Sequence, residues 1–200
     1  DFPTPAWIIE AAKEAMDRGQ TRYTPASGTM ELKKAVCAKL KRENGLDYAP
    51  DQIVVSNGAK HSLFNACMAV LDPGDEVIIP SPYWVTYPEL VRMAGGVPVF
   101  VQTDSAHDYV MSGAALEAAI TPRTRALILN SPSNPCGAMY DRAALEEVAR
   151  VAVAHDLIVI SDEIYEALCY DGERQISIAT LDGMYDRTIV VNGLSKAYAM

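Results

Sequence analysis

The sequence predicts an α/β fold in which a mostly parallel sheet is flanked by helices, giving three layers. Short runs of β-branched residues alternate with longer stretches of helical periodicity, a pattern typical of βαβ units. Of the 200 residues, 50% are apolar and 22% are charged, which is enough for one sizeable core, or for one domain with part of another. Polar clusters follow the predicted strands, where such sheets carry their functional groups.

The predicted strands are short apolar runs bounded by turn residues. They span residues 52–56, 76–80, 97–102, 125–130, 157–161 and 188–192. The predicted helices repeat with the period of an α-helix. They span residues 5–18, 29–43, 60–71, 85–94, 113–120 and 142–155. Asp141 is a suitable N-cap for the last helix, and Asp72-Pro-Gly-Asp75 is typical of a turn between a helix and a strand.

The charge and the apolar pattern exclude several classes of protein. The net charge is −9 and no long run of lysine or arginine is present, which argues against binding to nucleic acid or to an anionic membrane. No apolar stretch reaches about 18 residues and no signal-peptide pattern is found, so we expect a cytoplasmic location. The cysteines form no Cys-x-x-Cys pair. We therefore expect reduced thiols, mainly in the core, and no metal site.

Lys196 follows the predicted strand 188–192, where an apolar run enters a small polar turn. A lysine held half-desolvated at such a place favours the neutral amine, which can condense with an aldehyde to form a Schiff base. Most lysines are solvated surface charges instead. The residues upstream decide between these alternatives.

Asp162 follows the apolar run 157–161, so its carboxylate is expected at the end of a buried strand, where an unpaired charge is costly. One hypothesis is that it pairs with the protonated nitrogen of a pyridine ring, which then acts as an electron sink. The alternative is that Ser161-Asp162-Glu163 forms a helix N-cap, with two acids that complement the helix dipole.

Three further residues fit a flat heteroaromatic ligand. Asn134 and Tyr165 offer an amide and a phenol to an oxygen on the same ring, although an Asn-Pro pair is commonly only a turn. Trp84 offers its indole face to the ring, although it is also a suitable core aromatic.

Residues 56–60 follow a predicted strand and open a predicted helix, so their free backbone N–H groups are suited to a phosphate. Gly58 allows close approach of the backbone. Lys60 is either a surface lysine of the first helical turn or a cation directed at an anionic ligand, and its spacing does not decide between the two.

In combination, these residues resemble fold-type I pyridoxal-phosphate enzymes, specifically class I aminotransferases of the bacterial aspartate aminotransferase subgroup. The resemblance covers nearly the whole chain, on the motifs DFPTP, YTPASG, NGAK, LDPGDEV, PYWV, NSPSNPCG, SDEIYE and KAYAM. It implies the large domain of the pyridoxal-phosphate-dependent transferase fold for residues 23–200. Residues 1–22 would form an N-terminal arm and part of a smaller second domain.

The resemblance assigns roles to the matching residues. Lys196 would hold pyridoxal 5′-phosphate and move the proton between the amino acid α-carbon and the cofactor. Asp162 would bind the ring nitrogen, Tyr165 and Asn134 the ring oxygen, and Trp84 the ring face. Trp84 and Asn134 would also contact the substrate.

The phosphate would bind the backbone of Gly58, Ala59 and Lys60. Lys60 would also bind the distal carboxylate of a dicarboxylic substrate. Tyr23 would reach the cofactor phosphate of a neighbouring subunit, which implies a homodimer.

Two positions differ from the usual family pattern. Cys136 stands where the family often has threonine, and Gly193 where it often has a phosphate-binding hydroxyl, for which Ser195 is a candidate substitute. The resemblance also implies a longer natural protein, with arginines for the phosphate and for the substrate α-carboxylate beyond Met200. It suggests a cis peptide bond at Asn134–Pro135.

The expected activity is transfer of an amino group between an L-amino acid, with aspartate preferred, and 2-oxoglutarate by a ping-pong mechanism. Aminotransferases acting on prephenate, on aromatic amino acids or on a broad range of substrates remain alternatives. A C–S lyase on the same fold is another alternative, and so is a regulatory protein that joins this fold to a DNA-binding module.

Overall fold

The computed structural model of the protein describes residues 2–200, so Asp1, with which the predicted N-terminal segment begins, lies outside the described residues. Five parallel strands form one sheet in the order β2-β1-β3-β4-β5. The strands are β1 (Glu76–Ser81), β2 (Val97–Gln102), β3 (Thr124–Asn130), β4 (Ile158–Asp162) and β5 (Thr188–Val191). The predicted parallel α/β fold is confirmed.

The helices agree with the predicted ones to within a few residues at each end. They are α1 (Ala6–Asp17), α2 (Met30–Lys39), α3 (Ala59–Val70), α4 (Thr86–Met93), α5 (Gly113–Ala119) and α6 (Arg142–Ala154). The predicted N-cap of α6 is confirmed, because Asp141 Oδ1 accepts the N–H of Ala144 at 2.8 Å. The predicted turn at residues 72–75 is confirmed by the Asp75 N–H, which donates to the Asp72 carbonyl at 3.1 Å.

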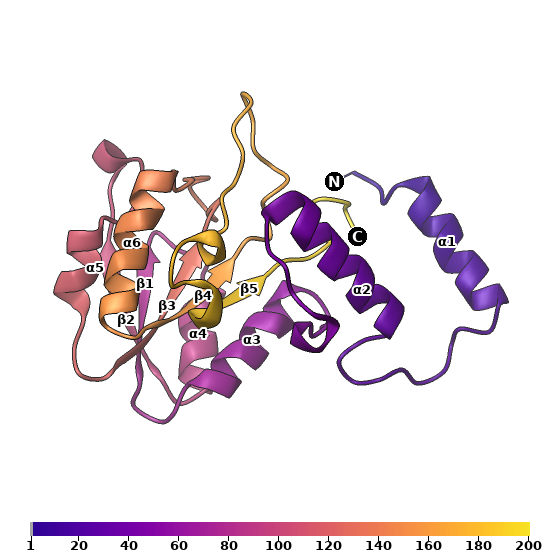
Figure 1. Cartoon of the computed structure of the whole chain (residues 1–200), viewed down its shortest axis with the longest axis horizontal. Helices are drawn as coiled ribbons and strands as arrows, with labels where there is room; N and C mark the ends of the chain where they lie inside the picture. Colours follow the sequence, from indigo (N-terminus) through magenta and orange to yellow (C-terminus); the bar gives the residue numbers. More distant parts are fainter. Residues whose placement is uncertain (1) are drawn as a thin grey trace.

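The sheet is covered on both faces, which gives three layers (Figure 1). Side chains alternate along each strand, so β3 sends Leu127 and Leu129 towards α5 and α6, and Ala126 and Ile128 towards α3 and α4. The inner strands β1, β3 and β4 are buried on both faces, as expected for a parallel sheet, which explains why they appear in the sequence as continuous apolar runs.

One predicted strand is absent from the structure. Pro50–Gln52 forms a short 3₁₀ helix, and residues 53–56 have no regular secondary structure and do not belong to the sheet. The Val55 N–H instead donates to the Ser27 carbonyl at 3.0 Å. A β-branched run becomes a strand only where a neighbouring strand lies beside it, and none of the described strands does so here.

The predicted helix at residues 29–43 is also modified. Its last part, Leu40–Asn44, is a π-helical turn that ends at Gly45. Gly45 has a φ of 72°, a left-handed conformation that suits glycine and ends the helix.

Helix α1 stands apart from the sheet (Figure 1). None of its side chains is buried. Trp7 packs edge-on against Tyr198 at 6.3 Å, and Thr4 Oγ1 donates to the carbonyl of Ala199, so the two ends of the described chain lie together. The division at residue 22 stays a prediction.

All four cysteines are free thiols, but only Cys67 is fully buried, so the expectation of mainly core cysteines is wrong. Cys136 and Cys169 lie in loops that leave them partly exposed. Within residues 2–200, no helix combines the length and the apolar character needed to cross a bilayer.

Glu163 directly follows β4 and is fully buried. Its Oε1 accepts hydrogen bonds from Ser161 Oγ at 2.9 Å and Ser177 Oγ at 2.7 Å, while Oε2 has no partner among the described residues. Burial raises the pKa of the carboxyl to about 7, against the opposing effect of the two hydroxyls. Glu163 therefore keeps its proton to near-neutral pH in the folded protein.

We expect Glu163 to make folding stability fall as the pH rises. Its contribution is fully present below about pH 4.5 and is lost as the pH rises to about 7, because the unfolded chain ionises first. The loss is on the order of 3 kcal/mol, at about 1.4 kcal/mol per pKa unit. We propose to measure the free energy of unfolding of the full-length protein in denaturant across this pH range. It should fall less steeply with pH in Glu163→Gln than in the wild type.

Glu173→Gln is the matched control, because Glu173 is exposed, and it should keep the wild-type slope. Identical slopes for wild type and Glu163→Gln would contradict the expected titration.

Candidate active site

The carboxyl ends of the parallel strands meet at one edge of the sheet and border a cavity of about 260 Å³. In the strand register, Asn130 at the end of β3 lies opposite Asp162 at the end of β4. Nine of the ten predicted site residues line the cavity, together with Tyr87 and Ile164. The nine are Gly58, Ala59, Lys60, Trp84, Asn134, Asp162, Tyr165, Ser195 and Lys196.

Asp162 is buried at the end of β4, with 3% of its surface exposed. Its Oδ2 accepts a hydrogen bond from the Tyr87 hydroxyl at 2.7 Å, and its Oδ1 accepts the N–H of Ile164 at 3.2 Å. Burial raises the pKa of the carboxyl, and both hydrogen bonds oppose that rise. No cation pairs with it among the described residues.

The alternative hypothesis of a helix N-cap at Ser161-Asp162-Glu163 is wrong. The residues after Asp162 form turns rather than a helix, and the next helical element is the 3₁₀ turn Ile178–Thr180. The Asp162 side chain stabilises only the first of these turns, through the Ile164 N–H.

Asn134 and Tyr165 lie together at the cavity, as predicted. The Asn134 side-chain amide donates to the Tyr165 hydroxyl at 3.3 Å. The Asn134–Pro135 peptide bond is cis, which confirms the prediction, and Ser81–Pro82 and Ser131–Pro132 are cis as well.

Asn130 connects the Asn134 loop to β4, a role that the sequence did not indicate. Its Oδ1 accepts the backbone N–H of Asn134 at 2.8 Å, and its Nδ2 donates to the Asp162 carbonyl at 2.9 Å. One side chain therefore holds the backbone of two predicted ligand residues. Its only sequence signal is an amide at the end of a strand.

Lys196 reaches the cavity, with its Nζ 5.7 Å from the centroid of the Tyr165 ring. The expectation that this lysine is half-desolvated is wrong for the described residues, because Lys196 is exposed. Residues 194–200 are all exposed, so no packed layer covers the amine.

Tyr23 is the predicted site residue that the structure does not bring to the cavity. Its side chain is fully exposed, with 107% relative exposure. No described residue donates a hydrogen bond to its hydroxyl or packs against its ring.

The N-terminus of α3 faces the cavity through Gly58, Ala59 and Lys60. Gly58 has a φ of 79°, a conformation that favours glycine, and this turns the chain so that the helix begins at Ala59. The N–H groups of Ala59 and Lys60 donate no hydrogen bond within residues 2–200, so they are available to an anion.

Lys60 directs its ammonium group over the indole of Trp84, with Nζ 5.0 Å from the ring centroid. Trp84 is half-buried. It lines the cavity, as the ligand hypothesis predicts, and it also packs against the core on the α3 and α4 side, as the core hypothesis predicts. The two side chains form one wall of the cavity, and that wall carries a positive charge.

Gly193 and Cys136 are the two positions that differ from the usual family pattern. Ser195 lines the cavity, while a Cβ on Gly193 would lie 2.9 Å from Ile164 Cδ1, so a larger residue there requires Ile164 to move. Cys136 Sγ lies 2.9 Å from Ser133 Oγ, inside the turn that carries Asn134.

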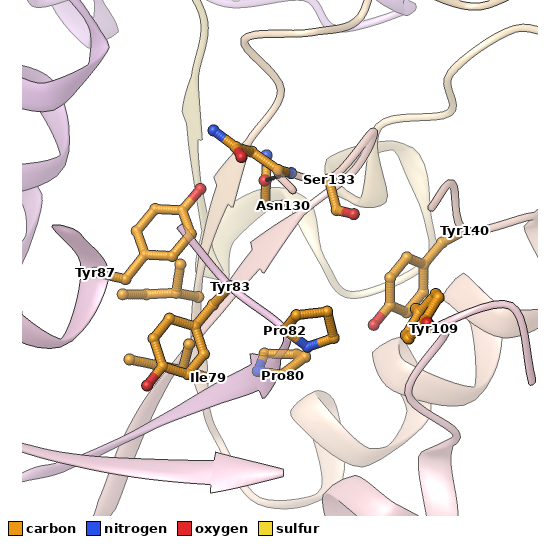
Figure 2. A pocket seen from close by; sticks show the side chains of 11 residues that line it. Ile79, Pro80, Pro82, Tyr83, Tyr87, Tyr109, Asn130, Ser133 and Tyr140 are labelled. Carbon is orange, nitrogen blue, oxygen red and sulfur yellow. Dashed lines mark hydrogen bonds between the residues drawn. The ribbon is translucent and has the colours of Figure 1, made fainter. Parts of the chain in front are cut away.

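A second, smaller cavity of about 20 Å³ lies behind the site, and Tyr87 and Asn134 line both cavities. Figure 2 shows it between Tyr83, Pro82 and Asn130 on one side and Tyr109 and Tyr140 on the other. Its size suits one water molecule rather than a substrate side chain. Within residues 2–200, no group of three or more His, Cys, Asp or Glu side chains could hold a metal ion.

A family model described as "Aminotransferase class I and II" matches residues 1–200. The chain belongs to this family. Class I and II aminotransferases of this kind depend on pyridoxal 5′-phosphate, and the structural neighbours share the pyridoxal-phosphate-dependent transferase fold. The predicted family and fold are thereby confirmed.

The similar proteins within this family are aminotransferases. The "Bifunctional aspartate aminotransferase and glutamate/aspartate-prephenate aminotransferase" of Petunia hybrida is 54% identical over the whole chain, which covers 42% of that protein. The crystal structure of an aspartate aminotransferase from Rhizobium meliloti has a TM-score of 0.98 at 50% identity, with all of this chain and 50% of that one covered. An aromatic aminotransferase from Pyrococcus horikoshii OT3 has a TM-score of 0.98 at 48% identity, covering all of this chain and 54% of that one.

The chain therefore spans about half the length of the aminotransferases that it matches.

We expect Asn130→Ala to loosen the candidate site. The substitution leaves the Asn134 N–H without a partner and the Asp162 carbonyl with only the Ser131 N–H, at a cost of about 1–3 kcal/mol in folding stability. Cofactor affinity of the full-length protein should fall about tenfold or more, because two ligand residues lose their support. Urea unfolding and cofactor titration by absorbance measure these effects.

Asn65→Ala on the exposed face of α3 serves as the control and should stay within about 0.5 kcal/mol of the wild type. Unchanged cofactor affinity in Asn130→Ala would show that the Asn134 loop holds its position without this amide.

Proposed function

We propose that the full-length protein is a pyridoxal 5′-phosphate-dependent aminotransferase that exchanges an amino group between an L-amino acid and a 2-oxo acid by a ping-pong mechanism. The observation that carries this proposal is the cavity at the carboxyl edge of the sheet. It brings an amine, a buried carboxylate, an amide–phenol pair, an indole and a helix N-terminus together. Each of these groups matches one part of the cofactor.

The fit to the cofactor is supported by Asp162. A buried carboxylate without a cationic partner destabilises the fold unless a cation reaches it. Asp162 would pair with a protonated ring nitrogen, the Ala59 and Lys60 N–H groups would bind the phosphate, and Trp84 would cover the ring face. Asn134 and Tyr165, which hydrogen-bond to each other at 3.3 Å, would both donate to the ring oxygen.

The chemistry that the bound cofactor supplies is an electron sink for the carbanion formed at the substrate α-carbon. Lys196 would hold the cofactor through its Nζ, and the same atom, as a free amine, would take the substrate α-proton. Asp162 would stabilise the positive charge on the ring nitrogen. Tyr165 and Asn134 would orient the ring through its oxygen.

Aspartate is the proposed amino donor and 2-oxoglutarate the proposed acceptor. Lys60 places a positive charge on the cavity wall, where it can bind the distal carboxylate of a dicarboxylic substrate. The similar proteins of Petunia hybrida and Rhizobium meliloti bear the name of aspartate aminotransferases, which supports this choice. Prephenate and aromatic amino acids are the second candidates, because the Petunia and Pyrococcus proteins are named for them.

We further propose a homodimer in which Tyr23 reaches the cofactor phosphate of the partner. The full exposure of Tyr23 supports this, since an isolated surface tyrosine has no other partner among the described residues. Residues 23–200 would form the cofactor-binding domain, with α1 belonging to an arm and a second domain. A cytoplasmic location stays a prediction of the sequence.

The first test is a half-reaction. Adding aspartate to the full-length protein with bound cofactor should replace the visible absorbance of the aldehyde form by that of the pyridoxamine form. Lys60→Met should raise the aspartate concentration needed for half-conversion by about tenfold to a hundredfold, the range expected for losing a charged hydrogen bond. The requirement for phenylalanine should change little.

No conversion with aspartate, glutamate, prephenate or an aromatic amino acid would refute the proposed activity. Release of ammonia and pyruvate would indicate a lyase instead.

The second test concerns Lys196. Lys196→Ala should fold normally, because the side chain is exposed, yet show no visible band from a covalently held cofactor. Lys41→Ala, at an exposed lysine outside the cavity, is the control and should keep the band. A wild-type spectrum in Lys196→Ala would exclude this lysine as the anchor.

A further inference from the structure

Tyr87 connects the two walls of the cavity and has no role in the function proposed above. It lies in the first turn of α4 with 2% of its surface exposed. Its ring packs edge-on against Trp84, with centroids 5.4 Å apart at 86°, and its hydroxyl donates to Asp162 Oδ2 at 2.7 Å. The same residue therefore touches the indole wall and the buried carboxylate.

The Tyr87 hydroxyl is a hydrogen-bond donor at neutral pH. Burial and the nearby Asp162 raise the pKa of Tyr87 above its usual range, so the phenol keeps its proton there. The other titratable side chains lining this cavity are Lys60, Tyr165 and Lys196, and none of them hydrogen-bonds to Asp162. Within residues 2–200, Tyr87 is the only side chain that donates to this carboxylate.

The two hydrogen bonds fix the carboxylate of Asp162 in space. One oxygen is held by the Ile164 N–H of its own turn, and the other by Tyr87 from a different element, so the carboxylate cannot rotate without losing a bond. Figure 2 shows the Tyr87 hydroxyl directed towards the side of Asn130, whereas the Tyr83 hydroxyl points away from it. Of these two tyrosines, only Tyr87 directs its hydroxyl to Asp162.

We propose that Tyr87 is a positioning residue that acts through Asp162, holding its carboxylate ionised and oriented towards the ring nitrogen of the cofactor. This inference rests on the proposed function. Burial alone favours the neutral acid, which cannot stabilise a protonated ring nitrogen. The hydrogen bond from Tyr87 offsets part of that effect before any cofactor binds.

The test uses Tyr87→Phe in the full-length protein with bound cofactor. The ring packing against Trp84 is retained and only the hydroxyl is lost. The visible absorbance of the lysine-bound cofactor reports the pKa of the nitrogen that joins the cofactor to Lys196. This pKa should rise, because a ring with less positive charge repels the proton on that nitrogen less. The rate of the aspartate half-reaction and the cofactor affinity should each fall about tenfold to a hundredfold.

Tyr83→Phe is the matched control. The Tyr83 ring stacks on Phe100 at 4.9 Å and its hydroxyl makes no hydrogen bond to Asp162, so the absorbance pKa and the half-reaction should stay at wild-type values.

The double substitution separates positioning from a general structural role. In an Asp162→Asn background, Tyr87→Phe should have little additional effect on the absorbance pKa, since Tyr87 acts through the carboxylate. Equal effects in both backgrounds, an unchanged absorbance pKa in Tyr87→Phe, or failure of that variant to fold would each overturn the inference. A wild-type protein without any cofactor band would instead refute the proposed function itself.

Discussion

The site depends on one constraint, which is that the carboxylate of Asp162 is buried at a strand end with no cation from residues 2–200 beside it. A parallel sheet covered on both faces leaves its strand ends as the place where polar side chains can gather, and the register sets Asn130 beside Asp162. The cost of burying that charge is offset only in part by Tyr87 and the Ile164 N–H. The Asp162 carboxylate therefore still requires a positive partner, and the protonated ring nitrogen of the proposed cofactor would be that partner.

The parts of the structure that follow from local chemistry were predictable from the sequence. Five of the six predicted strands are present, because continuous apolar runs between helical segments have few alternatives to a buried parallel sheet. The clustering of Asn134, Asp162, Tyr165 and Lys196 follows from the same rule, since the carboxyl ends of parallel strands converge. The strand predicted at residues 52–56 was wrong because pairing depends on a neighbour that local sequence does not reveal.

Two residues that shape the site could not have been found this way. Tyr87 appears in the sequence as an apolar position of an amphipathic helix, and only the docking of α4 brings its hydroxyl to Asp162. Asn130 ends a strand like many other amides, and its two hydrogen bonds depend on the turn that returns Asn134 to it. The exposure of Lys196 was likewise not predictable, because desolvation depends on what packs over a residue.

The central claim is that this edge of the sheet holds pyridoxal 5′-phosphate on Lys196. The most direct measurement is reduction of the full-length protein with its cofactor by borohydride, followed by mass spectrometry of the peptides. Our account predicts that the mass of the reduced cofactor is found on the peptide that contains Lys196. Finding it on the peptide containing Lys60, on another lysine, or on no peptide would contradict the account.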